Sequence, residues 1–147
     1  MEPLSTNEYI WGLIVLFPLL GAIINGVLGS KLPRVLSDSI AIIAMFFSFC
    51  ASIAATVTLM GQASGDGAYG ALVYNAYQWI YSGGMSIDIA FLLDPLSAVM
   101  ILVITGVGFL IHIYSLGYMA DDPGKWKYFS YLNLFVFAML LLVLGKN

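Results

Sequence analysis

The chain of 147 residues is strongly apolar: 61 % of its residues are hydrophobic, 9 % are charged, and the mean hydropathy is +0.97. A soluble domain carries about 25 % charged residues, and a net charge of −3 offers no basic surface for nucleic acid. With one cysteine and one histidine, the chain excludes a disulfide framework, an iron–sulfur cluster and a Cys/His metal site of its own. The composition indicates an integral membrane protein.

Four uncharged apolar runs are each long enough to cross a bilayer. A hydrocarbon core about 30 Å thick needs a helix of about 20 residues. Lipid offers no partner for backbone polar groups, so such runs must be helical. The sequence therefore predicts an all-α integral membrane protein with transmembrane helices at residues 10–28, 35–60, 95–119 and 128–145.

The connection between the second and third helices, residues 61–94, has a different character because it mixes glycines with polar residues. Residues that favour strands dominate at 77–81 and 86–91, and Gly83-Gly84 between them is a turn signal. We expect a periplasmic β-hairpin in this connection. Isolated hairpins are marginal in water, so this one should lean on the membrane surface or on a partner.

Small residues and one capping pair mark two of the predicted helices. Gly21, Gly26 and Gly29 would let a neighbouring helix approach the first one closely, although no Gly-x-x-x-Gly pair is present. Asp94-Pro95 combines an N-cap carboxylate with proline at the first helical position. We interpret this pair as a structural cap at the start of the third helix. The alternative is that Asp94 carries protons.

The distribution of basic residues predicts the orientation in the membrane. Four of the five lie in the two loops that join the first helix to the second and the third to the fourth: Lys31, Arg34, Lys125 and Lys127. By the positive-inside rule these loops are cytoplasmic, whereas the N-terminus and the hairpin lie outside. Lys146 is the exception. We expect a multi-pass protein of the bacterial inner membrane or of an equivalent energy-transducing membrane.

His112 is the one histidine, and it falls inside the third helix. Ionisable groups within a membrane are candidates for function. A rise of about 1.5 Å per residue places His112 about 24 Å along the helix, near the cytoplasmic surface. We expect an interfacial imidazole that bonds a neighbouring group; a proton-entry relay and metal or haem ligation are the alternatives. The structural or proton-relay candidates of the chain are Asp94, Pro95, His112, Tyr114 and Tyr118.

The chain carries no Walker motif, dinucleotide-binding glycine fingerprint or His-x-x-x-His pair. We therefore assign no catalytic, cofactor-binding or metal-binding residue to it. A family resemblance rests instead on a series of motifs, which are Asp94-Pro95-Leu96-Ser97, Ile104 to Ser115, Gly117-Tyr118-Met119, Asp122-Pro123-Gly124 and Phe129 to Leu140. This series resembles the N-terminal part of the subunit L family of proton-pumping NADH–quinone oxidoreductase, to which mitochondrial NADH dehydrogenase subunit 5 belongs. Before about residue 80, only the topology, Trp79 and the hairpin-like segment fit.

The resemblance implies an antiporter-like subunit of a membrane arm that forms part of a proton-channel scaffold. Its partners would be other membrane-arm subunits and lipid, and not nucleic acid. NADH, FMN, iron–sulfur clusters and quinone are expected in other subunits. In this family, a glutamate in the span after the fourth and lysines deeper in the chain carry the proton path, and these positions fall beyond Asn147. The family's proteins are several times longer, so we expect a fragment, a truncated product or one piece of a split subunit.

Two other functions remain open at this point. The same fold serves multisubunit cation/proton antiporters and membrane-bound hydrogenases, in which the transported ion and the electron donor differ. A small, non-enzymatic four-helix membrane scaffold is the second alternative. Neighbouring genes would separate the first alternative from the oxidoreductase.

Overall fold

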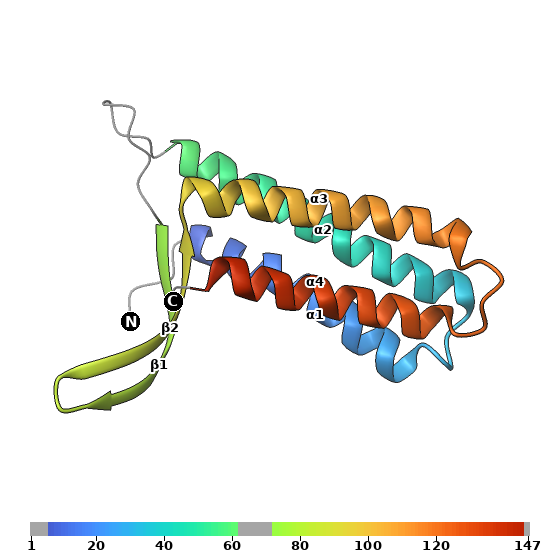
Figure 1. The fold of residues 1–147 in the computed structure, drawn as a ribbon, viewed down its shortest axis with the longest axis horizontal. Coiled ribbons are helices and arrows are strands. Elements are labelled where there is room, and N and C mark those ends of the chain that lie inside the picture. The colour runs from blue at the N-terminus through green and yellow to red at the C-terminus, as the bar shows by residue number, and fades with distance from the viewer. Residues whose placement is uncertain (1–5, 62–71, 146–147) are drawn as a thin grey trace.

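The computed structural model describes the backbone of residues 6–61 and 72–145, and within these ranges the side chains of residues 12–61, 78–87 and 89–145. The described residues form an elongated bundle of helices with a β-hairpin at one end (Figure 1). Its elements in chain order are α1 (Thr6–Leu28), α2 (Arg34–Gly61), β1 (Leu72–Ser82), β2 (Met85–Leu93), α3 (Pro95–Tyr118) and α4 (Lys125–Leu144). Residues 62–71 of the predicted connection and Lys146 lie outside the described residues.

The four predicted helices occupy nearly the observed ranges, but the placement of three basic residues in loops is wrong. Arg34 begins α2, and Lys125 and Lys127 lie in the first turn of α4. The carbonyl of Pro33 accepts the amide of Ser37 at 3.1 Å, which starts the helical turn before the apolar run begins. Lys125 is tolerated in a first turn because its ammonium group pairs with Asp38 of α2, and Lys127 because it is exposed.

Among the described residues, α2, α3 and α4 are long and apolar enough to cross a membrane. The described apolar part of α1, Gly12–Leu28, is shorter than these three. Large apolar side chains stay exposed on the outside of the bundle, including Leu110, Phe135 and Leu142. Helices that are apolar on all sides are typical of a membrane-spanning protein, so the chain is a mostly helical, multi-pass membrane protein.

The helices pack around a buried core. α1 packs against both α2 and α4, and α3 packs against α2, whereas α3 and α4 meet more loosely. The largest fully buried apolar side chains come from every helix and from the end of the hairpin: Ile14, Met45, Leu93, Ile101, Phe129, Leu140 and Leu144. This core fixes the relative position of the polar side chains described below.

The hairpin forms where the sequence predicts it, with longer strands than expected. Its antiparallel strands pair from Leu72 opposite Leu93 to Ser82 opposite Met85. Gly83 and Gly84 join them with φ values of 61° and 87°, and only glycine adopts two successive positive φ angles at little cost.

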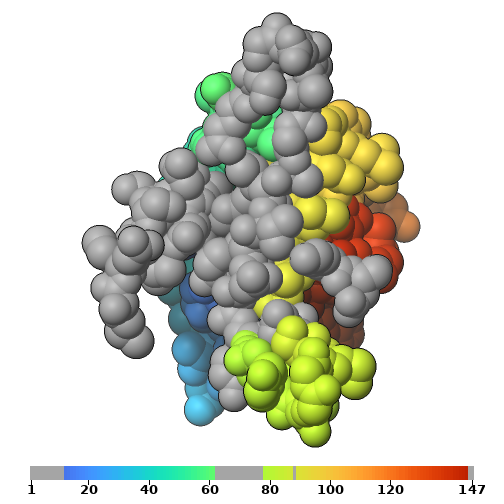
Figure 2. All heavy atoms as spheres, turned by 90° about the vertical axis from the view of Figure 1, so that its left-hand side faces the viewer, coloured from blue at the N-terminus to red at the C-terminus, as the bar shows by residue number. Residues whose placement is uncertain are grey.

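The base of the hairpin packs on its own helices, and the expected support from a membrane surface or a partner stays a prediction. Leu93 at its base is fully buried in the core, and the backbone of Phe91 pairs with that of Gly145 just after α4. Figure 2 looks onto this end of the molecule and shows the described part of the hairpin projecting at one edge. Asp94 follows β2 directly, so the hairpin leads straight into α3.

Candidate functional site

Asp94 caps α3 as the sequence predicts. Its backbone is extended, with φ −103° and ψ 173°, and its Oδ1 accepts the backbone N–H of Ser97 at 2.6 Å. Pro95 occupies the first helical position and is exposed. The N–H of Ser97 stabilises the carboxylate, so this hydrogen bond lowers the pKa of Asp94 below its ordinary value. The described contacts of Asp94 are those of a cap.

His112 is fully buried among the helices. Its expected depth near the cytoplasmic membrane surface stays a prediction. The expected bond to a neighbouring group is present: Nε2 lies 3.1 Å from Oδ1 of Asn133 on α4. Nδ1 lies 2.6 Å from the carbonyl oxygen of Gly108, one turn earlier in α3. The ring also stacks on that of Phe129, with 5.9 Å between the centroids. The bundle thus holds the imidazole between two oxygen atoms.

Tyr114 and Tyr118 do not join His112. Their side chains are 70 % and 73 % exposed, and their rings stack on each other at 5.9 Å between centroids. The structure therefore separates the five structural or proton-relay candidates into three places. Asp94 and Pro95 start α3 at the hairpin end, His112 lies inside the bundle, and the two tyrosines face outward.

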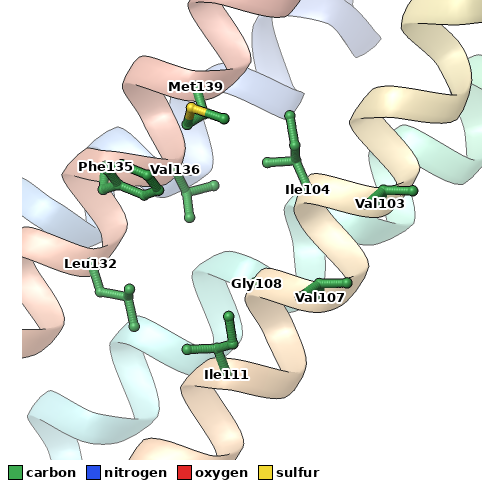
Figure 3. A pocket seen from close by; sticks show the side chains of 9 residues that line it. All are labelled: Val103, Ile104, Val107, Gly108, Ile111, Leu132, Phe135, Val136 and Met139. Carbon is green, nitrogen blue, oxygen red and sulfur yellow. The ribbon is translucent and has the colours of Figure 1, made fainter.

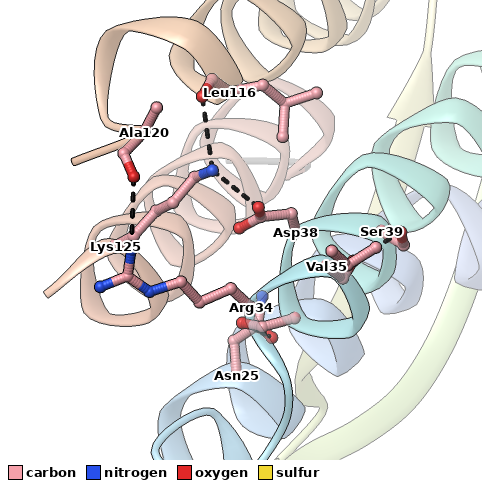
Figure 4. Close-up of polar contacts among 9 residues, drawn as sticks. Asn25, Arg34, Val35, Asp38, Ser39, Leu116, Ala120 and Lys125 are labelled. Atoms are coloured by element: carbon pink, nitrogen blue, oxygen red, sulfur yellow. Dashed lines mark hydrogen bonds and ion pairs between the residues drawn. The ribbon is translucent and has the colours of Figure 1, made fainter. Parts of the chain in front are cut away.

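A buried ion pair joins α2 to α4, and the sequence interpretation missed it. Nζ of Lys125 lies 2.7 Å from Oδ2 of Asp38, and each residue is less than a tenth exposed. The same Nζ donates to the carbonyl oxygen of Leu116 near the end of α3 at 3.3 Å, so three helices meet at Lys125 (Figure 4). Nη1 of Arg34 donates to the carbonyl oxygen of Ala120 at 3.4 Å, which ties α2 to the α3–α4 connection.

Buried and partly buried polar side chains also link α1 to α2, α1 to α4 and α3 to α4. The Ser37 hydroxyl of α2 donates to Oδ1 of Asn25 on α1 at 3.0 Å. The Ser130 hydroxyl of α4 donates to the carbonyl oxygen of Ala22 on α1 at 2.8 Å. Ser115 of α3 and Tyr128 of α4 share a hydrogen bond of 3.0 Å between their hydroxyls. These links, with His112–Asn133 and Lys125–Asp38, we call the interhelical polar bonds.

Gly21 and Gly26 of α1 and Gly29, which follows the helix directly, allow the close contact that the sequence predicts. A Cβ atom on Gly21 would lie 2.9 Å from Nδ2 of Asn133, and one on Gly29 would lie 2.9 Å from the Cβ of Trp126. A Cβ atom on Gly26 would lie 3.0 Å from the Ser130 hydroxyl oxygen. The missing side chains therefore let α1 approach α4 closely enough for the interhelical polar bonds to form.

A pocket of about 250 Å³ lies between α3 and α4 (Figure 3). Its walls are apolar throughout: Val103, Ile104, Val107, Gly108, Ile111, Leu132, Phe135, Val136 and Met139. Such a lining holds no polar group that could orient a cofactor. Among the described residues, no group of His, Cys, Asp and Glu could hold a metal ion.

Comparison with known proteins decides the family. The family described as NADH-ubiquinone oxidoreductase (complex I), chain 5 N-terminus, matches residues 79–129. NADH-quinone oxidoreductase subunit L of Neisseria meningitidis is 35 % identical over 136 residues, which cover 92 % of this chain and 19 % of that protein. The chain belongs to the subunit L and chain 5 family. The resemblance carried by the motifs from Asp94 onward is thus confirmed.

Two further relatives show how far the match extends. Subunit L of Mycobacterium tuberculosis is 38 % identical over 141 residues, 96 % of this chain and 22 % of that protein. NADH-ubiquinone oxidoreductase chain 5 of Dictyostelium discoideum is 35 % identical over 139 residues, 95 % of this chain and 20 % of that protein. The chain spans about a fifth of the length of the curated relatives it matches. By their names, these relatives are parts of an oxidoreductase.

We predict that the cap of α3 depends on pH in a defined direction. The pKa of Asp94 is lower in the folded chain, so its contribution is complete above the unfolded value of about 3.9 and is lost as the pH falls through the folded value. The protection factor of the Ser97 amide, which is the exchange rate of an unstructured peptide divided by that of this amide at the same pH, should therefore fall at acidic pH. Asp94→Ala should lower the free energy of unfolding by about 0.5–2 kcal/mol at neutral pH.

Asp94→Asn is the matched control, because asparagine also caps helices but does not titrate. Its Ser97 amide should stay protected, and the acid-dependent step should disappear. An acid-dependent step of the same size in Asp94→Asn would show that another group controls the start of α3.

The Lys125–Asp38 pair gives a second prediction. Lys125→Ala leaves a buried carboxylate without its partner and should destabilise the bundle by about 3–5 kcal/mol. The double variant Asp38→Ala/Lys125→Ala should lose less than the two single changes together, because no charge is then left uncompensated. Unfolding free energies in lipid or detergent measure both effects.

Lys127→Ala is the control, since Lys127 is exposed two residues further along the same helix. Its change should be within about 0.5 kcal/mol of the parent. Additive losses for Asp38→Ala and Lys125→Ala would contradict the interaction between them.

Proposed function

We propose that this chain is the N-terminal portion of a membrane-arm subunit in a proton-translocating NADH–quinone oxidoreductase. The observation that carries the proposal is the similarity to subunit L over more than nine-tenths of the chain. NADH, FMN, iron–sulfur clusters and quinone would be bound by other subunits. The chain would contribute a rigid wall to the proton channel and would pack against other membrane-arm subunits.

The proposed orientation follows from the charge at the two ends of the bundle. The α1–α2 and α3–α4 connections lie at the end opposite the hairpin (Figure 1), and Lys31, Arg34, Lys125 and Lys127 lie in or beside them. The positive-inside rule then supports a cytoplasmic location for this end. We propose that α1 also crosses the membrane, so that the N-terminus and the hairpin share the outer side of the inner, or equivalent energy-transducing, membrane.

Affinity purification tests the assembly. A tagged copy of the chain, solubilised from its own membranes in mild detergent, should recover a complex that oxidises NADH and reduces quinone; an untagged strain provides the control. Recovery with hydrogenase or cation/proton antiporter subunits would contradict the proposal and favour those relatives. Recovery of the chain alone would favour a scaffold protein.

Cysteine labelling tests the orientation. In a Cys50→Ala background, a membrane-impermeant maleimide should label Ser82→Cys in the hairpin turn from outside intact cells. It should label Asp121→Cys in the α3–α4 connection only after permeabilisation. The parent protein is the control, because Cys50 lies within the apolar run of α2 and should stay unlabelled by this water-soluble reagent. Labelling of Asp121→Cys in intact cells would invert the orientation.

A further inference from the structure

Each ring nitrogen of His112 lies within hydrogen-bond distance of an oxygen atom in the bundle. Gly108 offers a backbone carbonyl oxygen to Nδ1, and Asn133 offers its side-chain oxygen Oδ1 to Nε2. A carbonyl oxygen only accepts hydrogen bonds. With the Asn133 amide in this orientation both ring nitrogens donate, as in the charged imidazolium, and the reverse orientation of the amide suits the neutral ring.

A neutral ring requires one change in this arrangement. The Gly108 carbonyl is fixed by the backbone of α3, so Nδ1 keeps its hydrogen and Nε2 becomes an acceptor. Asn133 then has to present its NH2 group to Nε2 in place of its oxygen. That NH2 group is available, because buried Nδ2 of Asn133 has no hydrogen-bond partner among the described residues. A half-turn of the Asn133 amide therefore satisfies the neutral ring without moving a helix.

The surroundings of Asn133 leave room for this half-turn. Gly21 of α1 faces the amide, and a Cβ atom there would lie 2.9 Å from Nδ2 and 3.3 Å from Cγ. The Cβ atom of Ala44 on α2 lies beside the same point, 3.0 Å from where a Cβ atom on Gly21 would be. Small residues thus line this side of the amide. The oxygen and nitrogen ends of an amide have nearly the same size, so either end fits against Gly21.

We propose that His112 is a proton-binding site, and that the orientation of the Asn133 amide changes with its charge. The proton binds the lone pair of Nε2 and leaves from the same atom, and no covalent bond changes elsewhere. Oδ1 of Asn133 faces the charged ring and Nδ2 faces the neutral ring. This goes beyond the proposed function, because it places a proton-binding group in the chain itself and depends only on contacts inside the described bundle.

The charged groups around His112 leave Asn133 as its described polar partner from another helix. On α4, Lys125 is neutralised by Asp38 of α2, and Tyr128 bonds Ser115. The Phe129 ring lies next to both Lys125 and His112: its centroid is 5.9 Å from Nζ of Lys125 and 5.9 Å from the centroid of the His112 ring. On α3 itself, Tyr114 and Tyr118 face outward, and the described side chains of α1 include no titratable group.

The single histidine of the chain makes the test direct. The full chain, labelled with ¹⁵N-histidine and ¹⁵N-asparagine and placed in phospholipid vesicles, gives one imidazole in a nitrogen NMR spectrum. Across the pH range in which the bundle stays folded, Nε2 should gain and lose its proton while Nδ1 keeps its own. The Asn133 side-chain amide should shift with the same midpoint.

Variants separate this coupling from a merely structural role. Asn133→Leu should abolish the coupled amide signal, with the Nδ1 proton retained on Gly108. Asn25→Leu removes an equally buried amide that bonds Ser37 of α2 and not His112, and it should leave the coupling in place. In the parent chain, a ring that stays in one charge state, or an Asn133 amide that does not follow its titration, would overturn the proposal.

Discussion

Helices inside a bilayer gain little by burying apolar surface against each other, because lipid tails are as apolar as leucine. Close packing and interhelical hydrogen bonds must therefore hold such a bundle together. Here the interhelical polar bonds connect α1 with α2, α1 with α4, α2 with α4, and α3 with α4. Each bond of this kind contributes about 0.6 kcal/mol on average, so the bundle depends on the set and on the small residues that let the helices meet.

This constraint explains which parts of the chain are polar and which are not. The outward side chains are large and apolar, as lipid or neighbouring membrane helices require. Each member of the interhelical polar bonds has its partner on another helix, whereas the buried hydroxyls of Ser52 and Thr105 bond carbonyl oxygens of their own helices. A bundle fixed in this way suits the wall of an ion channel, because helices that slid or rotated would move the channel's lining with them.

His112 shows how a bond that holds the fold can also carry chemistry. Its ring joins α3 to α4 through Asn133, as the other interhelical polar bonds do. It differs because imidazole gains or loses a proton more easily than a serine hydroxyl or an asparagine amide. The partner therefore has to suit two charge states, and an amide with a donor and an acceptor at its two ends meets that need.

Local signals in the sequence were enough to predict the helices, the Gly83-Gly84 turn and the Asp94-Pro95 cap. Each depends on residues that are neighbours in the chain. The Lys125–Asp38 and His112–Asn133 pairs depend on how separate helices rotate and pack, which no local pattern encodes. One signal was available: Asp38 and Lys125 have opposite charges and lie at the same predicted end of two helices. The buried position of His112 followed from α4 covering it, so the estimate of depth along α3 could not reveal it.

A cryo-EM structure of the chain in a lipid environment, within the assembly recovered from its membranes, tests the central claim most directly. The account predicts α1 to α4 crossing the bilayer together, Lys125 against Asp38, and His112 against Asn133 inside the bundle. A map in which Lys125 reaches into water away from Asp38, or in which His112 faces lipid, would contradict it.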